Sequence, residues 1–278
     1  MQRTCAWKEL LAILPPWLSQ EVDKFRNDIL QELRLRLDQP PQLILKDRSL
    51  WLTRPISRED LRFTVNTASK YSPWAVQTIA RGYITAHGGH RIGLCGEAVI
   101  QNSAMTGIRT VRSLCIRVAR DFPGIAKNFG SISGSFLIIG PPASGKTTFL
   151  RDLLRQFSLS QTVAVVDERC ELFPDGQFSG WKGLDVMSGC PKVQAVDALL
   201  RTMGPDTLAM DEITAREDCD ALLQAGWCGV RLVATAHAES ISDLRNRPLY
   251  KPIMSANLFR HILVLSRDKT IHEERMTL

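Results

Sequence analysis

Residues 136–147 read FLIIGPPASGKT and combine two patterns that together predict a nucleotide-binding α/β domain. The last eight residues match the phosphate-binding loop G-x-x-x-x-G-K-[ST]. The four apolar residues before them have the composition of a buried strand, and the residues after them place apolar side chains at helical spacing as far as Phe157. Because a strand, a loop and a helix in this order form the context in which the motif binds phosphate, we expect a nucleoside triphosphate here.

The residue types within the loop indicate separate roles. Backbone N–H groups of the turn and of the helix N-terminus would hold phosphate oxygens. Lys146 would reach the β- and γ-phosphates, and Thr147 would bind Mg²⁺. The expected cofactors are therefore ATP and Mg²⁺, and the predicted nucleotide-binding residues are Gly140, Pro141, Pro142, Ala143, Ser144, Gly145, Lys146, Thr147 and Thr148.

A second apolar run, residues 208–210, ends in two adjacent carboxylates. Ligands bind at the carboxyl edge of a parallel sheet, which is where such a strand would place them. We expect Asp211 to hold Mg²⁺ through water and Glu212 to polarise the attacking water, since phosphoryl transfer depends mainly on positioning and charge. The alternative is a pair of acidic residues that serve the dipole of the following helix.

The chain after residue 130 alternates apolar strands, at 162–166, 207–210, 231–234 and 261–265, with helical stretches. This alternation predicts a parallel sheet with right-handed crossovers. The strand between the two motifs ends in Asp167, Glu168 and Arg169, an order similar to that of RecA-like and secretion-type ATPases. That likeness places the strand ending at Thr235 beside the phosphate loop, with His237 near the γ-phosphate. Asp167 and Glu168 either assist Mg²⁺ or water positioning, or pair with Arg169.

Length and charge divide the chain of 278 residues in two. Residues 1–127 carry 19 Lys and Arg against 11 Asp and Glu, net +8, whereas residues 128–278 carry 16 against 18, net −2. We place the boundary in the small polar segment 130–135, giving an N-terminal α+β domain at 1–129 and an ATPase domain at 130–278. The excess basic charge can serve nucleic acid, acidic lipid or a neighbour's nucleotide.

Patterns in the N-terminal half predict strands at 33–37, 43–45 and 90–100, and helices at 58–71 and 75–83. Seven cysteines without a C-x-x-C pair argue against a disulfide framework, so we expect reduced thiols in a cytosol. We expect no integral membrane segment, because no apolar run reaches the length of a spanning helix.

In order along the chain, several segments resemble the stage III sporulation protein AA family. They are the phosphate loop and residues 88–93, 107–109, 116–120, 166–169, 188–192, 211–213, 217–219, 235–237 and 247–248. The likeness runs from about residue 30 to residue 268, and it departs from the family at Thr214, where glycine is usual.

This resemblance implies an ATPase related to the hexameric ATPases of type II and type IV secretion. It would act in the mother cell, on the inner face of the membrane, with the membrane proteins of the stage III sporulation channel into the forespore. By the same likeness, Arg91 and Arg117 would act as arginine fingers on a nucleotide of their own or an adjacent subunit; exposed strand charge is the alternative for each.

Two other functions stay open from the residues alone. A nucleotide-gated nucleic-acid-binding protein would use the basic N-terminal domain, but residues 1–127 lack a Lys and Arg run interleaved with aromatic residues. A small-molecule kinase would need an acceptor pocket, which the sequence does not reveal.

Overall fold

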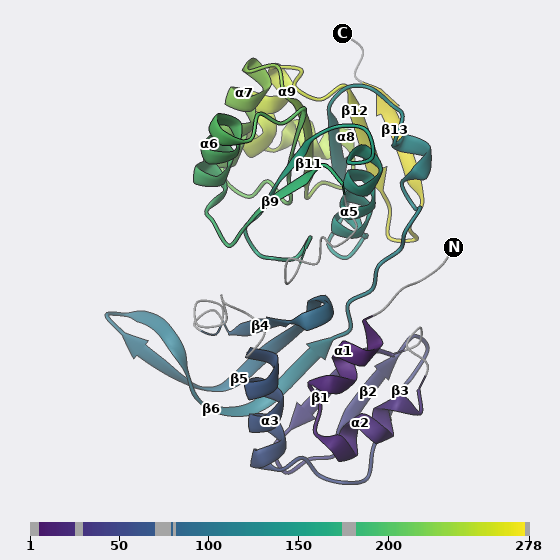
Figure 1. Ribbon diagram of the computed structural model, residues 1–278, viewed down its shortest axis with the longest axis vertical. Helices are drawn as coiled ribbons and strands as arrows, with labels where there is room; N and C mark the ends of the chain where they lie inside the picture. Colours follow the sequence, from purple (N-terminus) through teal and green to yellow (C-terminus); the bar gives the residue numbers. More distant parts are fainter. Residues whose placement is uncertain (1–5, 26–29, 70–78, 80–81, 174–181, 276–278) are drawn as a thin grey trace. The chain divides into compact units, whose positions relative to one another are not determined.

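The computed structural model describes residues 6–25, 30–69, 79, 82–173 and 182–275, and these form two compact units (Figure 1). The first unit includes the described residues up to Asp121, and the second begins at Phe122. No helix in these described ranges combines the length and the apolar character needed to cross a bilayer.

The first unit is a six-stranded sheet covered by helices. Its strand order is β3-β2-β1-β6-β5-β4, and the paired strands are antiparallel. Leu33 and Leu35 of β1 and Ile116 of β6 alternate with polar residues and join one hydrophobic core with the helices. The elements are α1 (Trp7–Ala12), α2 (Pro16–Asp23), β1 (Leu30–Arg36), β2 (Gln42–Leu45), β3 (Ser49–Trp51), α3 (Arg58–Ser69), β4 (Tyr83–Ala86), η1 (His87–Gly89), β5 (His90–Gln101) and β6 (Ala104–Arg117).

The second unit is a seven-stranded sheet of order β13-β12-β7-β11-β10-β8-β9. Neighbouring strands pair in parallel, except that β13 runs antiparallel to β12. The elements are η2 (Lys127–Phe129), β7 (Phe136–Ile139), α5 (Lys146–Phe157), β8 (Val163–Asp167), β9 (Leu184–Ser188), α6 (Lys192–Thr202), β10 (Thr207–Met210), α7 (Arg216–Trp227), β11 (Arg231–Ala236), α8 (Ile241–Asn246), η4 (Pro248–Tyr250), α9 (Lys251–Ser255), β12 (His261–Leu265) and β13 (Ile271–Arg275).

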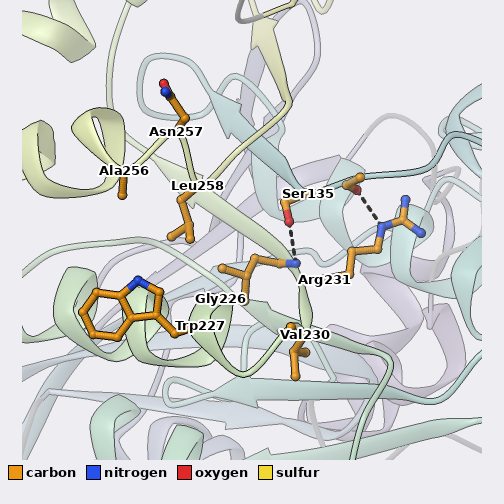
Figure 2. A pocket seen from close by; sticks show the side chains of 11 residues that line it. Ser135, Gly226, Trp227, Val230, Arg231, Ala256, Asn257 and Leu258 are labelled. Atoms are coloured by element: carbon orange, nitrogen blue, oxygen red, sulfur yellow. Dashed lines mark hydrogen bonds between the residues drawn. The ribbon is translucent and has the colours of Figure 1, made fainter. Parts of the chain in front are cut away.

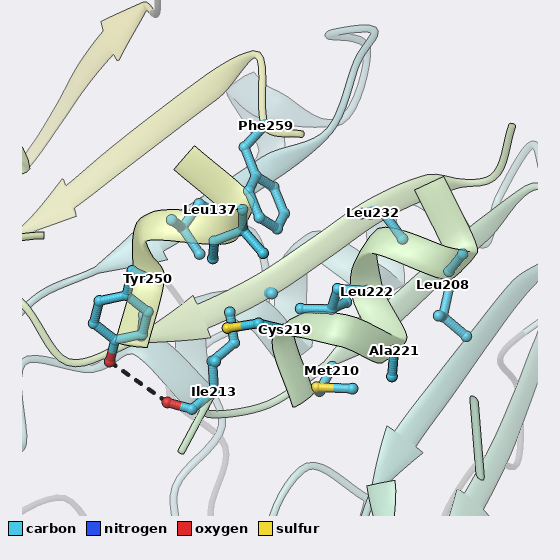
Figure 3. Packing of buried hydrophobic residues seen from close by; sticks show 14 of the residues in the cluster. Leu137, Leu208, Met210, Ile213, Cys219, Ala221, Leu222, Leu232, Tyr250 and Phe259 are labelled. Carbon is cyan, nitrogen blue, oxygen red and sulfur yellow. Dashed lines mark hydrogen bonds between the residues drawn. The ribbon is translucent and has the colours of Figure 1, made fainter. Parts of the chain in front are cut away.

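Helices cover both faces of this sheet, which is why its strands are apolar throughout. Residues of β7 alternate between two cores: Leu137 and Ile139 belong to the core on the side of α6 and α7, and Phe136 and Ile138 to the core on the side of α5. Figure 3 shows part of the first core, where the Tyr250 hydroxyl also donates to the carbonyl of Ile213 at 3.5 Å. Packing in the two cores holds the strands in place, and with them the edge of the sheet where the phosphate loop begins.

The division between the units differs from the predicted boundary at 129/130. Residues 122–129 pack with the second unit, because the buried Asp152 carboxylate of α5 accepts hydrogen bonds from the backbone N–H groups of Gly124 and Ala126, at 3.0 and 2.8 Å. Ala126 is itself fully buried. A polar, glycine-rich segment therefore lies inside the second unit, and the division falls before it.

Five strands and one helix also differ from the sequence predictions. The patterns did not predict β3, β4, β6, β9 or β13. The expected helix 75–83 lies mostly outside the described residues, and Tyr83 begins a strand.

Candidate nucleotide site

The phosphate loop connects the carboxyl end of β7 to the first turn of α5 and has an unusual backbone. Gly145 and Ala143 adopt positive φ angles of 102° and 60°. Gly140 is required for close packing, because a Cβ there would lie 2.3 Å from the carbonyl oxygen of Leu265 on β12. The Ser144 hydroxyl is buried with no hydrogen-bond partner among the described residues. A loop with this backbone conformation can direct its N–H groups toward a phosphate.

Lys146 is buried at the start of α5 and folds back over the loop. Its Nζ donates to the carbonyl oxygens of Gly140 and Pro141, at 2.8 and 3.0 Å, and lies 3.1 Å from Nδ1 of His237. Burial lowers the pKa of Lys146, and the nearby carboxylates of Asp211 and Glu212 oppose that shift. The ammonium group is thus held at the loop by neutral carbonyl oxygens. An anionic phosphate would bind it more strongly than these acceptors do.

Thr147 and Asp211 meet as the metal-binding prediction requires. The Thr147 hydroxyl donates to Oδ2 of Asp211 at 3.0 Å, and the Thr235 hydroxyl donates to Oδ1 at 2.7 Å. Burial raises the pKa of Asp211, partly offset by these two hydrogen bonds. Among the described residues, no three His, Cys, Asp or Glu side chains gather as metal ligands. One hydroxyl and one carboxylate suit Mg²⁺, which keeps several waters and takes phosphate oxygens as further ligands.

Glu212 follows β10 with a positive φ of 52°, which is uncommon for a residue other than glycine. Its Oε1 lies 3.0 Å from Nε2 of His237, and its Oε2 accepts from Arg169 at 2.8 Å. Its backbone N–H donates to the Thr235 hydroxyl at 2.7 Å. Since the Lys146 ammonium donates to Nδ1 of His237, the proton of that imidazole belongs on Nε2, facing Glu212.

The turn after Glu212 rests on a buried ion pair. Nζ of Lys192 lies 3.1 Å from Oδ2 of Asp218 and also donates to the Glu212 carbonyl at 2.6 Å. The same Asp218 oxygen accepts from the backbone N–H and the hydroxyl of Thr214, at 2.8 and 3.1 Å. Thr214 is not among the residues with a positive φ, so a threonine fits this turn, and its hydroxyl adds a hydrogen bond to Asp218.

Asp167, the last residue of β8, makes contacts other than those expected. Asp167 is buried and its carboxylate accepts from the backbone N–H groups of Glu171, Leu172 and Phe173, at 2.8–3.2 Å. Burial raises its pKa, and these hydrogen bonds lower it. Glu168 follows it and is partly exposed, whereas Arg169 pairs with Glu212. Asp167 therefore shapes the loop after β8, and Arg169 pairs with Glu212, which was not among the partners considered for it.

Arg91 and Arg117 lie on β5 and β6 of the first unit, directly paired across the two strands. The Arg91 guanidinium lies 4.4 Å from the ring centre of Tyr83, and the Arg117 side chain is 71% exposed. Both belong to the compact unit that does not contain the phosphate loop.

Sequence reasoning missed three side chains that support the site. Lys192 holds the turn after Glu212, and Lys269 donates to the carbonyl of Ala143 in the loop. Arg169 was considered only as a partner of the acidic residues that precede it, not as a contact of Glu212. Each contacts a residue that is distant in the sequence, and no local sequence pattern marks it as a site residue. Only the order of the strands in the sheet brings it to the site.

A separate cavity of about 490 Å³ lies at the other end of the sheet (Figure 2). It is lined by residues at the amino ends of β7 and β11, including Ser135 and Arg231, and by Trp227 at the end of α7. The Ser135 hydroxyl accepts from the N–H of Leu232 at 3.0 Å. Because the phosphate loop follows the carboxyl end of β7, this cavity is not the nucleotide site.

Comparison with known proteins identifies the relatives of this chain. Residues 8–275 match the family described as "Sporulation stage III, protein AA". The chain belongs to the stage III sporulation protein AA family. Within this family it is 36% identical over 258 residues to Stage III sporulation protein AA of Bacillus subtilis (strain 168), covering 86% of this chain and 83% of that protein. The resemblance inferred from the sequence motifs is confirmed.

More distant matches show how this stage III sporulation protein AA family member folds. It is similar to the Legionella pneumophila ATPase DotB, with a TM-score of 0.58 and 15% identity over 94% of this chain and 80% of that chain. It is also similar to the pilus retraction motor PilT with bound ADP, with a TM-score of 0.61 and 14% identity over 89% and 76%. At these identities the comparison establishes the fold of secretion-type ATPases.

Proposed function

We propose that this protein is a Mg²⁺-dependent ATP hydrolase whose second unit is a RecA-like ATPase domain. The observation that carries the proposal is the meeting of four side chains from two separate motifs. Lys146 and Thr147 of the phosphate loop lie with Asp211 and Glu212 of the β10 edge in one hydrogen-bonded group, as a triphosphate site requires.

Each part of the group has a role in phosphoryl transfer. The backbone N–H groups of residues 143–148 and the Lys146 ammonium would hold the phosphates, while Thr147 and Asp211 would hold Mg²⁺. When bound, that ion would neutralise charge on the phosphate oxygens. Glu212 would orient the attacking water, and its carboxylate is kept in place by His237 and Arg169.

Three further residues have roles in the same proposed function. Glu168, which directly follows β8, would assist water or metal positioning. Arg91 or Arg117 would supply positive charge to the transferring phosphoryl group from the same or a neighbouring subunit. The fold likeness to secretion-type ATPases supports this role for the first unit, and a homohexamer is the assembly in which it would operate.

The family supports a biological setting. We propose that the protein acts on the inner face of the mother-cell membrane, peripherally, and powers or assembles the stage III sporulation channel into the forespore with its membrane proteins. Membership in the stage III sporulation protein AA family is what supports this setting.

Steady-state phosphate release from ATP tests the hydrolytic role. We expect Glu212→Gln to slow release at least about 100-fold, because a positioned base contributes about that much or more. Binding of ATP should persist, since the phosphate loop is unchanged. The matched control is Glu217→Gln, an exposed residue in the first turn of α7. Turnover by Glu212→Gln equal to that of the control would refute the assignment. Phosphate release without an added acceptor also separates this function from a small-molecule kinase.

A further inference from the structure

The six-stranded sheet of the first unit has one face packed under helices and one face that carries polar and charged side chains. Leu33 and Leu35 of β1 are fully buried, whereas the alternating Arg34 and Arg36 are partly exposed. Since successive side chains of a strand point to opposite faces, Arg34 and Arg36 lie on the face away from the helical core. We call this the arginine face, and its members follow from the strand register.

One cross-strand row of the arginine face runs the full width of the sheet. The pairings place in this row Trp51, Gln42, Arg34, Cys115, Gly93 and Tyr83, from β3 to β4. Directly paired residues share a face, so an aromatic side chain lies at each end of the row. Five strand spacings of about 4.8 Å separate the two aromatic positions by about 24 Å.

The two neighbouring rows add positive charge on the central strands. They contain Ser49, Ile44, Glu32, Arg117, Arg91 and Thr85 on one side, and Arg36, Ser113 and Cys95 on the other. Glu32 is the one acidic residue in the three rows, where it contacts Arg34 and lies 3.9 Å from Arg117. With four arginines and one glutamate, the arginine face carries a net charge of +3.

Guanidinium groups and aromatic rings lie together at both ends of the face. The Arg36 guanidinium lies 5.8 Å from the ring centre of Trp51, and the Arg91 guanidinium lies 4.4 Å from that of Tyr83. Trp51 is 52% exposed although it is a large aromatic residue. Between the aromatic ends, Cys115 has a small side chain and Gly93 has none, so neither residue projects far from the sheet.

We propose that the arginine face binds single-stranded nucleic acid. Unpaired bases stack on aromatic rings and on guanidinium planes, and a positive sheet surface follows the phosphates. All four cations of the three rows are arginine, which stacks and pairs bidentately with phosphate, whereas lysine does neither. This composition favours nucleic acid over a lipid surface or an acidic protein. Strand pairing supplies the interleaving of aromatic and basic side chains that the linear sequence lacks.

Fluorescence anisotropy of the full-length protein with a labelled oligothymidylate of about 20 nucleotides tests the proposal, because such platforms cover about 4–16 nucleotides. The measurement is made at low salt without ATP, so that its result does not depend on hydrolysis. We expect log Kd to change with log salt by about 0.7 for each phosphate contact, and by about 2 to 3 in total. Trp51→Ala should weaken binding at least about 5-fold through lost stacking. Arg36→Gln should weaken it and reduce the salt slope by about 0.7.

Matched controls come from outside the arginine face. Trp227→Ala removes an exposed tryptophan of the second unit, and Arg62→Gln removes an exposed arginine of α3, so both should bind the oligonucleotide as the wild type does. The proposal is overturned by absence of binding at low salt, or by equal losses in the face and control variants. Tighter binding to phosphatidylglycerol vesicles or to polyglutamate than to the oligonucleotide would also overturn it.

Discussion

Replacing Lys192 with methionine removes the cation of the most buried ion pair near the site. The side chains of Lys192 and Asp218 are only 6% and 7% exposed, and their charged atoms lie 3.1 Å apart. The change leaves the Asp218 carboxylate buried without its counter-ion and frees the Glu212 carbonyl from its 2.6 Å contact. A methionine of similar length fills the space, so the loss measured is electrostatic.

The structure sets the size of this loss. Breaking a buried pair by removing one partner costs about 3–5 kcal/mol. Asp218 keeps the N–H groups of Thr214 and Ala215 at 2.8 and 3.1 Å and stays in the first turn of α7, where the helix dipole favours negative charge. The cost therefore falls near the lower limit, about 3 kcal/mol. A unit of this size loses about 2–4 °C per kcal/mol, which gives a fall in Tm of about 6–12 °C.

Scanning calorimetry is the suitable assay, because two compact units need not unfold in one transition. Lys251→Met, at an exposed lysine that begins α9, is the control and should change stability by no more than about 0.5 kcal/mol. Adding Asp218→Asn to Lys192→Met should restore most of the loss, since no unpaired charge remains. A decrease in Tm below about 2 °C for Lys192→Met would show that the pair does not carry the stability assigned to it.

Two further substitutions test the loop and the buried aspartate. Gly140→Ala places a Cβ 2.3 Å from the Leu265 carbonyl oxygen, so we expect the free energy of unfolding to fall by about 1–3 kcal/mol in calorimetry and ATP binding to be lost in titration. The control is Gly107→Ala, whose Cβ meets nothing within 4 Å and which should change neither measurement. Equal behaviour of the two variants would contradict the packing argument. Asp211→Asn removes a carboxylate whose pKa is raised by burial. Because the raised pKa stabilises the folded protein only at low pH, wild-type stability should fall relative to the variant as pH rises above about 3.9 in the absence of nucleotide and metal. A stability difference that does not change with pH, in urea titrations from acid to neutral pH, would be inconsistent with that burial.

Local patterns were sufficient for much of the second unit. The apolar runs that became β7, β10, β11 and β12 are continuous because both sheet faces are covered, and this leaves a signal in the sequence. The phosphate loop and the Asp211-Glu212 pair follow two of these strands directly. The likeness to secretion-type ATPases then placed His237 near the γ-phosphate, and in the structure its Nδ1 lies 3.1 Å from Nζ of Lys146.

Edge strands and long-range contacts were not predictable for physical reasons. β9 is only partly buried, and β13 contains the polar residues His272, Glu273 and Glu274, so neither shows a continuous apolar run. Lys192 and Asp152 look like ordinary polar residues of amphipathic helices. Each is buried only because a distant backbone or carboxylate meets it, and the register that brings them together is a property of the folded sheet.

The hydrogen bonds of the site connect the group that would meet phosphate to the group that would orient water. His237 accepts from the Lys146 ammonium at Nδ1 and faces Glu212 with Nε2, at 3.1 and 3.0 Å. Thr235 similarly joins the Asp211 carboxylate to the Glu212 backbone, at 2.7 Å on both sides. If Lys146 turns from the loop carbonyls toward a phosphate, its contact with His237 changes, and so does the partner that holds Glu212. Under the proposed function, we therefore expect phosphate binding at the loop to change the contacts that hold the Glu212 carboxylate, through His237 just after β11.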